Sequence, residues 1–295
     1  MKKNILILGG SGFLGFNVTK RLSKIKFYKL DVLTKKINHK KKFKNVNYIY
    51  ADLTNIKKLK NIKNKRYNYI INLSGNIDHK NKSQTLKAHY NGLINILETI
   101  DIKALDLFIQ IGSSLEYGKK KSPQKESFNC NPISFYGKTK YKASLILNKY
   151  LNKFIILRPY QIYGPHQKDN RLIPTAIKSC INNKVFPCTD GNQLRDFLYV
   201  DDFTNLILKL LKKKQHKSNI FNVGSGNPIK VKKVISLINE ITKKGKPLFG
   251  KIKMRKDEIK KLFPNIERLK KELNWKPKIN IKTGLKKTVS FYEKD

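Results

Sequence analysis

The sequence is poor in cysteine and has no long apolar segment. Its three cysteines, Cys130, Cys180 and Cys188, are an odd number in a chain of 295 residues. An odd number argues for reduced thiols and against a disulfide framework. No apolar run approaches the roughly 20 residues that a membrane helix needs, and the first run, residues 5–8, is shorter than the core of a secretion signal. We therefore expect a cytoplasmic protein without a membrane segment.

Histidine is also scarce. The five histidines are scattered at positions 39, 79, 89, 166 and 216, and none has a second histidine or a cysteine at the spacing of a zinc site. The sequence therefore predicts no metal centre.

Acidic residues are few beside basic ones. The 20 Asp and Glu residues face 64 Lys and Arg residues, which gives a formal net charge of +44. Such a charge attracts polyanions, so one hypothesis is a non-catalytic protein that binds nucleic acid or another polyanion. However, the lysines are spread along the whole chain and accompany no recognisable nucleic-acid motif. We favour a general bias toward lysine over a nucleic-acid partner.

The chain is organised around residues 4–15, Asn-Ile-Leu-Ile-Leu-Gly-Gly-Ser-Gly-Phe-Leu-Gly. A short apolar run predicts a buried strand, and the helical spacing after the glycines predicts a helix. A glycine turn between them lets a pyrophosphate approach the backbone and the positive end of the helix. The candidate cofactor contacts in this turn are Gly9, Gly12, Phe13, Leu14 and Gly15.

Strands and helices alternate over the first half of the chain. Strands are predicted at residues 5–8, 28–34, 48–51, 69–73, 107–111 and 154–157, and helices at 86–100 and 134–151, the second with Ser134 as N-cap. This order predicts an α/β fold with a doubly wound parallel (Rossmann) sheet. Ligands bind beyond the carboxyl ends of such strands, where Gly9, Ser74 and Ser113 are expected.

The second half of the chain differs in composition, because it has several prolines with only short predicted elements between them. We assign residues 1–165 to a dinucleotide-binding domain, to which 195–215 return, and residues 166–295 to a smaller, interleaved substrate domain. Helices are predicted at 201–213 and 229–241, a strand at 220–223, and a solvated loop at 243–247.

The end of the second strand bears on the choice of cofactor. An acidic residue there binds the ribose 2′-OH of NAD, whereas a basic residue suits the 2′-phosphate of NADP. Asp31 lies within the apolar strand, so Thr34 is at its tip and Lys35 and Lys36 follow. We therefore predict a preference for NADP(H), against the alternative that both lysines belong to the general bias. Further candidate cofactor contacts at strand ends are Asp52, Leu53 and Ser74.

Tyr136 and Lys140 have the spacing that places two side chains on one face of a helix. A lysine ammonium beside a phenol favours the phenolate, so such a tyrosine can exchange a proton with a sugar hydroxyl. Tyr117 and Lys121 have the same spacing, but Gly118 and a proline follow Tyr117 and predict a loop. The alternative for Tyr136 is a half-buried helix tyrosine beside a solvated lysine.

These residues resemble the extended short-chain dehydrogenases/reductases, the NAD-dependent epimerase/dehydratase family of nucleotide-sugar enzymes. The resemblance covers nearly the whole chain and rests on six motifs in the family's order. They are residues 9–15, Gly-Gly-Ser-Gly-Phe-Leu-Gly; 112–118, Gly-Ser-Ser-Leu-Glu-Tyr-Gly; 136–140, Tyr-Gly-Lys-Thr-Lys; 157–165, Leu-Arg-Pro-Tyr-Gln-Ile-Tyr-Gly-Pro; 195–202, Arg-Asp-Phe-Leu-Tyr-Val-Asp-Asp; and 221–226, Phe-Asn-Val-Gly-Ser-Gly.

The resemblance implies a role for each catalytic candidate. Ser113 is implied to hold the reacting sugar oxygen, Tyr136 to be the acid/base, and Lys140 to tune Tyr136 and bind the nicotinamide ribose. It further implies that Arg195 and Arg255 contact the nucleotide-sugar phosphates or base, and it makes a homodimer possible. Ser114 and Arg171 are further candidates, so the predicted substrate contacts are Ser114, Arg171, Arg195 and Arg255.

Departures from the family pattern narrow the expected reaction. In 4,6-dehydratases of the family a Glu stands where this chain has Leu115, and leucine cannot move a proton. Glu116 is one place off, and we expect it to face the other side of the strand end. The motif looks more like that of the 4-keto-6-deoxy-sugar reductases and is compatible with 4-epimerases. His89 and Gln161 stand where many members carry Asn, which affects the expected placement of substrate.

Overall fold

The computed structural model describes residues 2–35, 42–63, 65–76, 81–213, 215–255 and 258–294. Lys36, the second of the two lysines predicted to follow the second strand, lies outside these ranges. The three cysteines are free thiols. Within the described ranges, no helix has both the length and the apolar character needed to cross a membrane.

Strands and helices alternate along the first half of the chain. The strands are β1 (Lys3–Leu8), β2 (Tyr28–Thr34), β3 (Val46–Tyr50), β4 (Tyr69–Asn72), β5 (Leu107–Ile111), β6 (Phe154–Pro159), β7 (Gln161–Tyr163), β8 (Val185–Pro187), β9 (Leu194–Arg195), β10 (Phe197–Tyr199), β11 (Asn219–Val223), β12 (Ile229–Lys230), β13 (Lys246–Leu248) and β14 (Lys261–Leu262). The α-helices are α1 (Phe13–Leu22), α2 (Lys82–Leu86), α3 (Gly92–Thr99), α4 (Phe135–Tyr150), α5 (Leu172–Ile181), α6 (Val200–Lys212), α7 (Val231–Thr242), α8 (Glu267–Leu273) and α9 (Ile281–Tyr292). The shorter helical turns are η2 (Ile56–Leu59), η3 (Lys87–Asn91), η4 (Ile102–Ala104) and η5 (Ser114–Tyr117).

The main sheet has seven strands in the order β11-β6-β5-β4-β1-β2-β3. Its strand pairs from β3 across to β6 are parallel. Strand order runs outward from β1 in both directions, so the carboxyl ends of β1 and β4 lie side by side at the point where the order reverses. The predicted doubly wound Rossmann sheet is confirmed.

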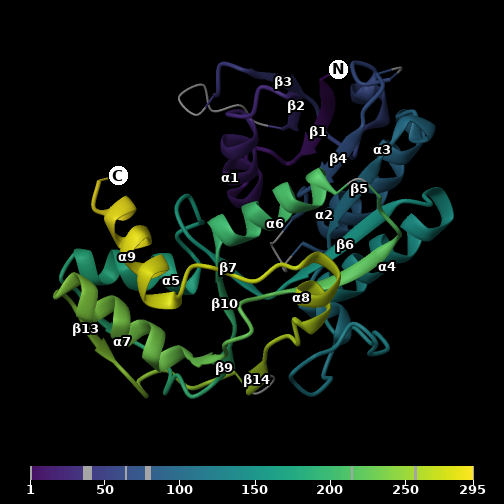
Figure 1. Ribbon diagram of the computed structural model, residues 1–295. Helices are drawn as coiled ribbons and strands as arrows, with labels where there is room; N and C mark the ends of the chain where they lie inside the picture. Colours follow the sequence, from purple (N-terminus) through teal and green to yellow (C-terminus); the bar gives the residue numbers. More distant parts are fainter. Residues whose placement is uncertain are drawn as a thin grey trace. The chain divides into compact units, whose positions relative to one another are not determined.

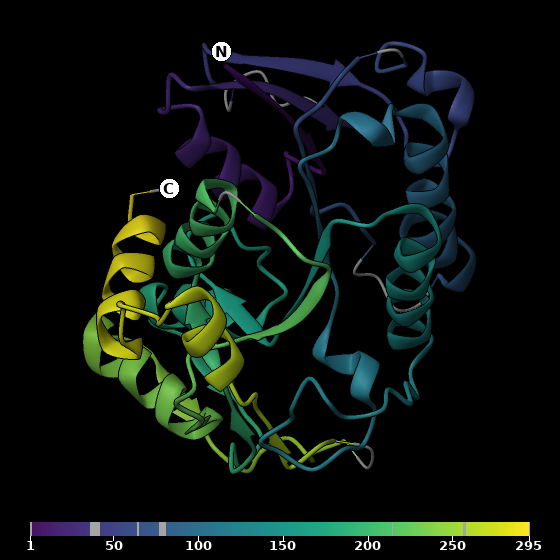
Figure 2. The same cartoon turned by 45° about the vertical axis from the view of Figure 1, so that its right-hand side comes forward.

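The helices on the two sides of this sheet bury different residues of the same strands. Figures 1 and 2 show α1 on one side and α3 and α4 on the other. Alternate residues of a strand point to opposite faces, and Leu6 and Leu8 belong to the cluster formed with α3 and α4. Leu93 of α3 and Leu147 of α4 are almost completely buried in that cluster. This packing fixes the start of α4 relative to the ends of β4 and β5.

The chain divides into two compact units. The first comprises residues 1–119, 126–159 and 204–221, and the second comprises 120–125, 160–203 and 222–295. In the second unit, α5, α7 and α9 contact one another (Figures 1 and 2). Our assignment of 1–165 with 195–215 to cofactor binding and of 166–295 to substrate binding stays a prediction.

Buried carboxylates fix turns inside the second unit. Asp196 is fully buried, and its two carboxylate oxygens accept hydrogen bonds from the backbone N–H groups of Ser225 and Gly226. Asp202, also buried, accepts from the backbone N–H groups of Lys278 and Ile279 at 3.0 and 2.9 Å. Each carboxylate thus replaces water as the partner of two backbone donors.

Two local predictions differ from the structure in detail. The helix predicted at 86–100 is divided into α2, the π-helical turn η3 and α3, because the backbone bonding widens over Lys87–Asn91. The predicted loop at 243–247 ends in β13, which pairs in parallel with β8 through Lys246 and Pro247. A lysine- and glycine-rich segment with a proline carries no sequence signal for such a short strand.

Candidate active site

The glycine turn between β1 and α1 forms a close backbone cradle. Gly9 has a φ of +75°, and a Cβ added to it would lie 2.8 Å from Ser74 Cα. A Cβ on Gly15 would lie 2.6 Å from Gly10 Cα, so larger residues would push the turn apart. Ser74, at the end of β4, is therefore adjacent to this turn.

The amino end of α1 is free of the side chains that usually neutralise a helix terminus. Gly12 is its N-cap and makes no side-chain hydrogen bond, and the first turn contains no acidic residue. Phe13 and Leu14 begin the helix as partly buried residues. Free N–H groups and the positive dipole end suit an anion. The turn and helix together fit the pyrophosphate of a dinucleotide cofactor.

The end of β2 presents hydroxyls and an ammonium. The Thr34 and Ser11 hydroxyl oxygens are 2.5 Å apart. Lys35 Nζ lies 2.8 Å from Asp52 Oδ2, and Thr54 donates to Asp52 Oδ1 through its backbone and its hydroxyl. Although burial opposes it, hydrogen bonding by Lys35 and Thr54 lowers the pKa of Asp52. Lys35 is thus at the predicted position, with a carboxylate as its partner.

Two further residues near the predicted cofactor site make contacts within the first unit. Asp31 is buried and accepts hydrogen bonds from Asn47, Lys65 and Tyr67, so its carboxylate is engaged inside the unit. Leu53 is buried, and its carbonyl accepts a hydrogen bond from the Asn95 side chain at 2.8 Å. For Asp31, this agrees with the prediction that it does not serve the cofactor ribose.

Ser113 begins the 3₁₀ turn η5 at the carboxyl end of β5. Its hydroxyl accepts a hydrogen bond from Leu115 N at 3.2 Å, and its own N–H donates to Glu116 Oε1 at 2.7 Å. The two bonds form a capping box that fixes the conformation of Ser113. Ser114, the next residue, is also buried.

Glu116 faces inward beneath Ser113, in a 3₁₀ turn and not at a strand end. Its side chain is fully buried and forms an ion pair with Arg158, whose Nη2 lies 2.8 Å from Glu116 Oε2. Ser144 of α4 donates to the same oxygen at 3.0 Å. The turn after β5 directs this side chain toward α4 and Arg158, and which side of the strand end it faces stays a prediction.

Lys140 is buried beside the start of α4, where the predicted N-cap Ser134 accepts a hydrogen bond from Gly137 N. Its Nζ donates to the carbonyl of Ile111 at 3.0 Å and lies 5.9 Å from the centre of the Tyr136 ring. Burial lowers the pKa of Lys140 from 10.5 to about 8, and the Glu116 carboxylate opposes that shift. The alternative of a solvated lysine at this position is wrong.

The competing tyrosine pair does not form such a site. Tyr117 is fully buried, with the Arg158 guanidinium 4.6 Å from its ring centre. Burial raises the pKa of Tyr117 to about 12, even though Arg158 opposes the shift. Lys121 is exposed. A tyrosine in this environment keeps its proton, which leaves Tyr136 as the candidate acid/base.

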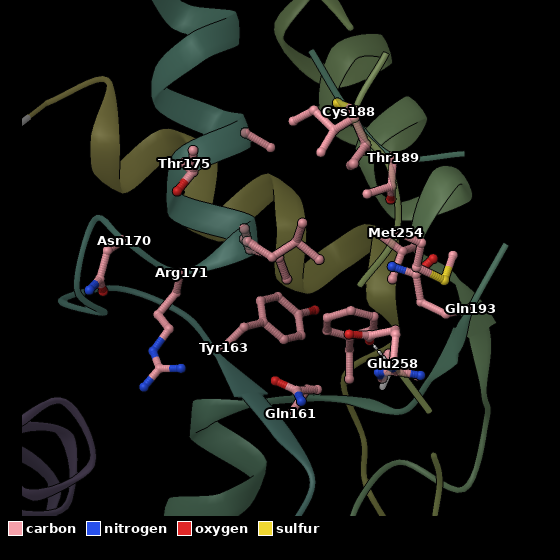
Figure 3. A pocket seen from close by; sticks show the side chains of 18 of the residues that line it. Gln161, Tyr163, Asn170, Arg171, Thr175, Cys188, Thr189, Gln193, Met254 and Glu258 are labelled. Atoms are coloured by element: carbon pink, nitrogen blue, oxygen red, sulfur yellow. Dashed lines mark hydrogen bonds and ion pairs between the residues drawn. The ribbon is translucent and has the colours of Figure 1, made fainter. Parts of the chain in front are cut away.

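A pocket of about 620 Å³ in the second unit gathers the three predicted arginines. Arg171, Arg195 and Arg255 all line it, as does Gln161. Figure 3 shows Arg171 and Glu258 at opposite sides of the pocket, with Tyr163 between them. The guanidinium groups give the pocket a positive lining suited to phosphate.

Glu258 and Gln193 are pocket residues that the sequence reasoning missed. Glu258 forms an ion pair with Arg195, and although burial lowers the pKa of Arg195, this carboxylate opposes the shift. The Gln193 side-chain oxygen is buried in the pocket lining and accepts no hydrogen bond from the described part of the chain. Both residues lie near predicted arginines in the sequence, but spacing alone does not distinguish them from other polar loop residues.

Metal ligands do not cluster in the ranges that the structure describes. No group of three histidine, cysteine, aspartate or glutamate side chains is arranged there to hold an ion.

Comparison with known families agrees with this geometry. The profile of the NAD dependent epimerase/dehydratase family matches residues 5–224. The chain is 28% identical to a UDP-glucuronate 4-epimerase of Thermodesulfobacterium geofontis, over 97% of this chain and 95% of that protein. It is 27% identical to a CDP-abequose synthase of Salmonella typhimurium, over 97% of both chains.

Solved structures resemble the whole chain. A UDP-glucose 4-epimerase from Thermotoga maritima, determined with UDP-glucose, has a TM-score of 0.91 and 25% identity over 99% of both chains. A dTDP-glucose 4,6-dehydratase from Bacillus anthracis, determined with NAD, has a TM-score of 0.84 and 25% identity, covering 99% of this chain and 97% of that one.

Replacing Glu116 by Gln should lower the free energy of unfolding by about 3–5 kcal/mol, because Arg158 then stays buried without a charged partner. Urea titration measures the loss. The matched control is Glu272→Gln, which breaks an exposed ion pair with Arg268 whose atoms are 2.7 Å apart and should cost about 1 kcal/mol or less. Equal losses in the two variants would contradict the structural role of the buried pair.

Proposed function

The chain belongs to the NAD dependent epimerase/dehydratase family, and we propose that it moves a hydride at carbon 4 of a nucleoside-diphosphate hexose. The observation that supports this most is the buried ammonium of Lys140, held by the Ile111 carbonyl beside the ring of Tyr136. A buried charge of this kind is expensive to maintain and points to a chemical role.

Tyr136 is proposed as the acid/base and Ser113 as the residue that orients the sugar oxygen. The Tyr136 phenolate, favoured by the Lys140 ammonium, takes the proton of the carbon-4 hydroxyl as the carbon–hydrogen bond breaks. A nicotinamide bound there would accept the hydride that leaves carbon 4. In the reverse direction carbon 4 of the 4-keto sugar regains a hydride, and Tyr136 returns the proton to the oxygen.

Two members of this reaction class stay open, a 4-epimerase and a 4-keto-6-deoxy-hexose reductase. Similarity to a UDP-glucuronate 4-epimerase and to a CDP-abequose synthase supports a reaction of this general kind. A 4,6-dehydratase is disfavoured, because Leu115 offers no proton-transferring group and Glu116 is engaged with Arg158. Product analysis separates the two. An epimerase needs no added reductant, whereas a reductase oxidises one reduced nicotinamide cofactor in each turnover.

The pocket in the second unit is proposed to bind the nucleoside diphosphate. Arg171, Arg195 and Arg255 supply the positive charge that two phosphates require. The relative crystallised with UDP-glucose has the same fold and supports a nucleotide-sugar ligand of this type.

NADP(H) is proposed as the preferred cofactor. The end of β2 offers the Thr34 and Ser11 hydroxyls and the Lys35 ammonium, while Asp31 is engaged within the unit. Thr34, the last residue of β2, carries no carboxylate, and the Lys35 ammonium that follows it favours the 2′-phosphate.

Replacing Tyr136 by Phe should lower turnover roughly 10²–10⁴-fold, because the variant lacks the hydroxyl that moves the proton. The measurement is the rate with UDP- and CDP-hexoses and with 4-keto-6-deoxy sugars, by mass spectrometry of products. Tyr141→Phe, on the same helix, is the matched control and should keep the wild-type rate. A Tyr136→Phe enzyme with near-wild-type turnover would refute the assignment.

The maximal rate should fall as the pH rises above about 8. Because the fold lowers the pKa of Lys140 from 10.5 to about 8, the ammonium is present below that pH and is lost above it. The phenolate of Tyr136 then loses the charge that favours it. Rates at saturating substrate from pH 6 to 10 test this, with circular dichroism to confirm that the protein stays folded. A flat profile to pH 10 is incompatible with the proposal.

Replacing Lys35 by Ala should weaken NADP(H) binding roughly tenfold and leave NAD(H) binding nearly unchanged, because only the 2′-phosphate needs the ammonium. Nucleotide fluorescence titration gives both affinities. Lys29→Ala, which removes an exposed lysine of the same strand, is the control and should change neither. If the wild-type protein binds NAD(H) more tightly than NADP(H), the proposed preference is wrong.

A further inference from the structure

His89 lies in the π-helical turn η3, directly against the proposed site. Its side chain is almost completely buried, with 3% of its surface exposed. A Cβ added to Gly75 would lie 2.7 Å from His89 Nε2 and 3.5 Å from Lys140 Nζ. The imidazole and the lysine ammonium therefore both contact the turn that follows β4, within one residue of Ser74.

The hydrogen-bond partners of His89 favour one tautomer of the neutral imidazole. The backbone N–H of Asn76 donates to Nε2 at 3.2 Å, so Nε2 carries a lone pair. In a neutral imidazole the other nitrogen then carries the proton, and Nδ1 lies 2.9 Å from Thr139 Oγ1. The Thr139 hydroxyl donates in turn to the carbonyl of Tyr136 at 2.9 Å. In this arrangement His89 Nδ1–H donates to Thr139 Oγ1, and the Thr139 hydroxyl donates to the Tyr136 carbonyl.

The same ring also packs on the proposed acid/base. The His89 and Tyr136 rings lie edge to face, with centroids 5.0 Å apart and planes at 86°. Such a contact restricts the rotation of the Tyr136 ring about its side-chain bonds. Tyr136 is thus restrained at its backbone, through Thr139, and at its ring, by the imidazole.

We propose that His89 is a positioning residue, neutral and protonated on Nδ1, that ties the turn after β4 to the first turn of α4. It fixes the Tyr136 ring relative to Lys140 and to the segment at Ser74. A proton-transferring group works only in a narrow range of distances and angles. Loss of the histidine should therefore reduce the rate of the chemical step more than the binding of ligands. The inference rests on the proposed function of Tyr136.

The protonation state can be tested without any enzyme assay. Long-range ¹H–¹⁵N spectra of the folded protein report which ring nitrogen carries a proton, and the chain has only five histidines. The signal missing from a His89→Gln sample identifies His89. At pH 7 we expect a protonated Nδ1 and an unprotonated Nε2. A proton on Nε2, alone or together with Nδ1, would overturn the proposed network, because Nε2 could not then accept from Asn76.

The two connections of the ring can be removed separately. His89→Gln places an acceptor near the position of Nε2 and loses the bond to Thr139, whereas His89→Asn keeps a group near Nδ1 and loses the bond to Asn76 N. His89→Leu removes both. We expect maximal rates to fall on the order of 10-fold in the first two variants and 10–100-fold in His89→Leu. The KM for the sugar and the affinity for nucleotide should stay within about threefold of wild type.

A double-mutant cycle isolates the Thr139 connection. Thr139→Val alone should lower the maximal rate, but it should add almost nothing in the His89→Gln background, where that bond is already absent. Additive effects, or a His89→Leu enzyme with the full wild-type rate, would overturn the positioning role. If the wild-type protein turns over no nucleotide sugar, the proposed function fails, and the spectra still decide whether the histidine network exists.

Discussion

Burial of one lysine ammonium is the constraint on which the proposed site depends. Lys140 has almost no contact with solvent, so its charge must be stabilised by the protein alone. The Ile111 carbonyl accepts one of its hydrogen bonds, and the Glu116 carboxylate raises its proton affinity against the effect of burial. Glu116 is in turn stabilised by Arg158 and Ser144. The first unit thus stabilises an ion beside Tyr136 through a sequence of buried polar contacts that starts at the sheet.

Much of the first unit followed from local pattern. The bounds of β2 and β5 and the N-cap of α4 were predicted from apolar runs and from a serine before a helical repeat. These features depend on neighbours in the sequence, which a single chain displays. The turn η3 was not predicted, because its wide backbone bonding accompanies contacts of His89 with Asn76 and Thr139, which are distant in sequence. The contacts of Glu116 were not predicted for the same reason, since its partner Arg158 is 42 positions away.

Less of the second unit could be predicted from residue spacing and composition. Of the three arginines proposed to bind phosphate, Arg195 and Arg255 were named by their match to the family, and all three line one pocket. Helices α5, α8 and α9 were not predicted, because prolines and dispersed lysines mask their apolar faces in the sequence. Neither the pairing of Arg195 with Glu258 nor the buried oxygen of Gln193 has a local signal. Roles that depend on three-dimensional neighbours cannot be assigned from one sequence.

The few acidic residues of this lysine-rich chain include several that act as internal anchors. Asp196 and Asp202 each secure two backbone N–H groups, and Glu116 secures Ser113 together with a buried arginine. A drift of composition toward lysine can replace exposed carboxylates with little loss of stability. Replacing the buried carboxylates would leave buried hydrogen-bond donors unpaired. The outer charge and the inner architecture can therefore evolve, or be redesigned, separately. A version of this protein with a neutral exterior should keep the same fold as long as these interior carboxylates are retained.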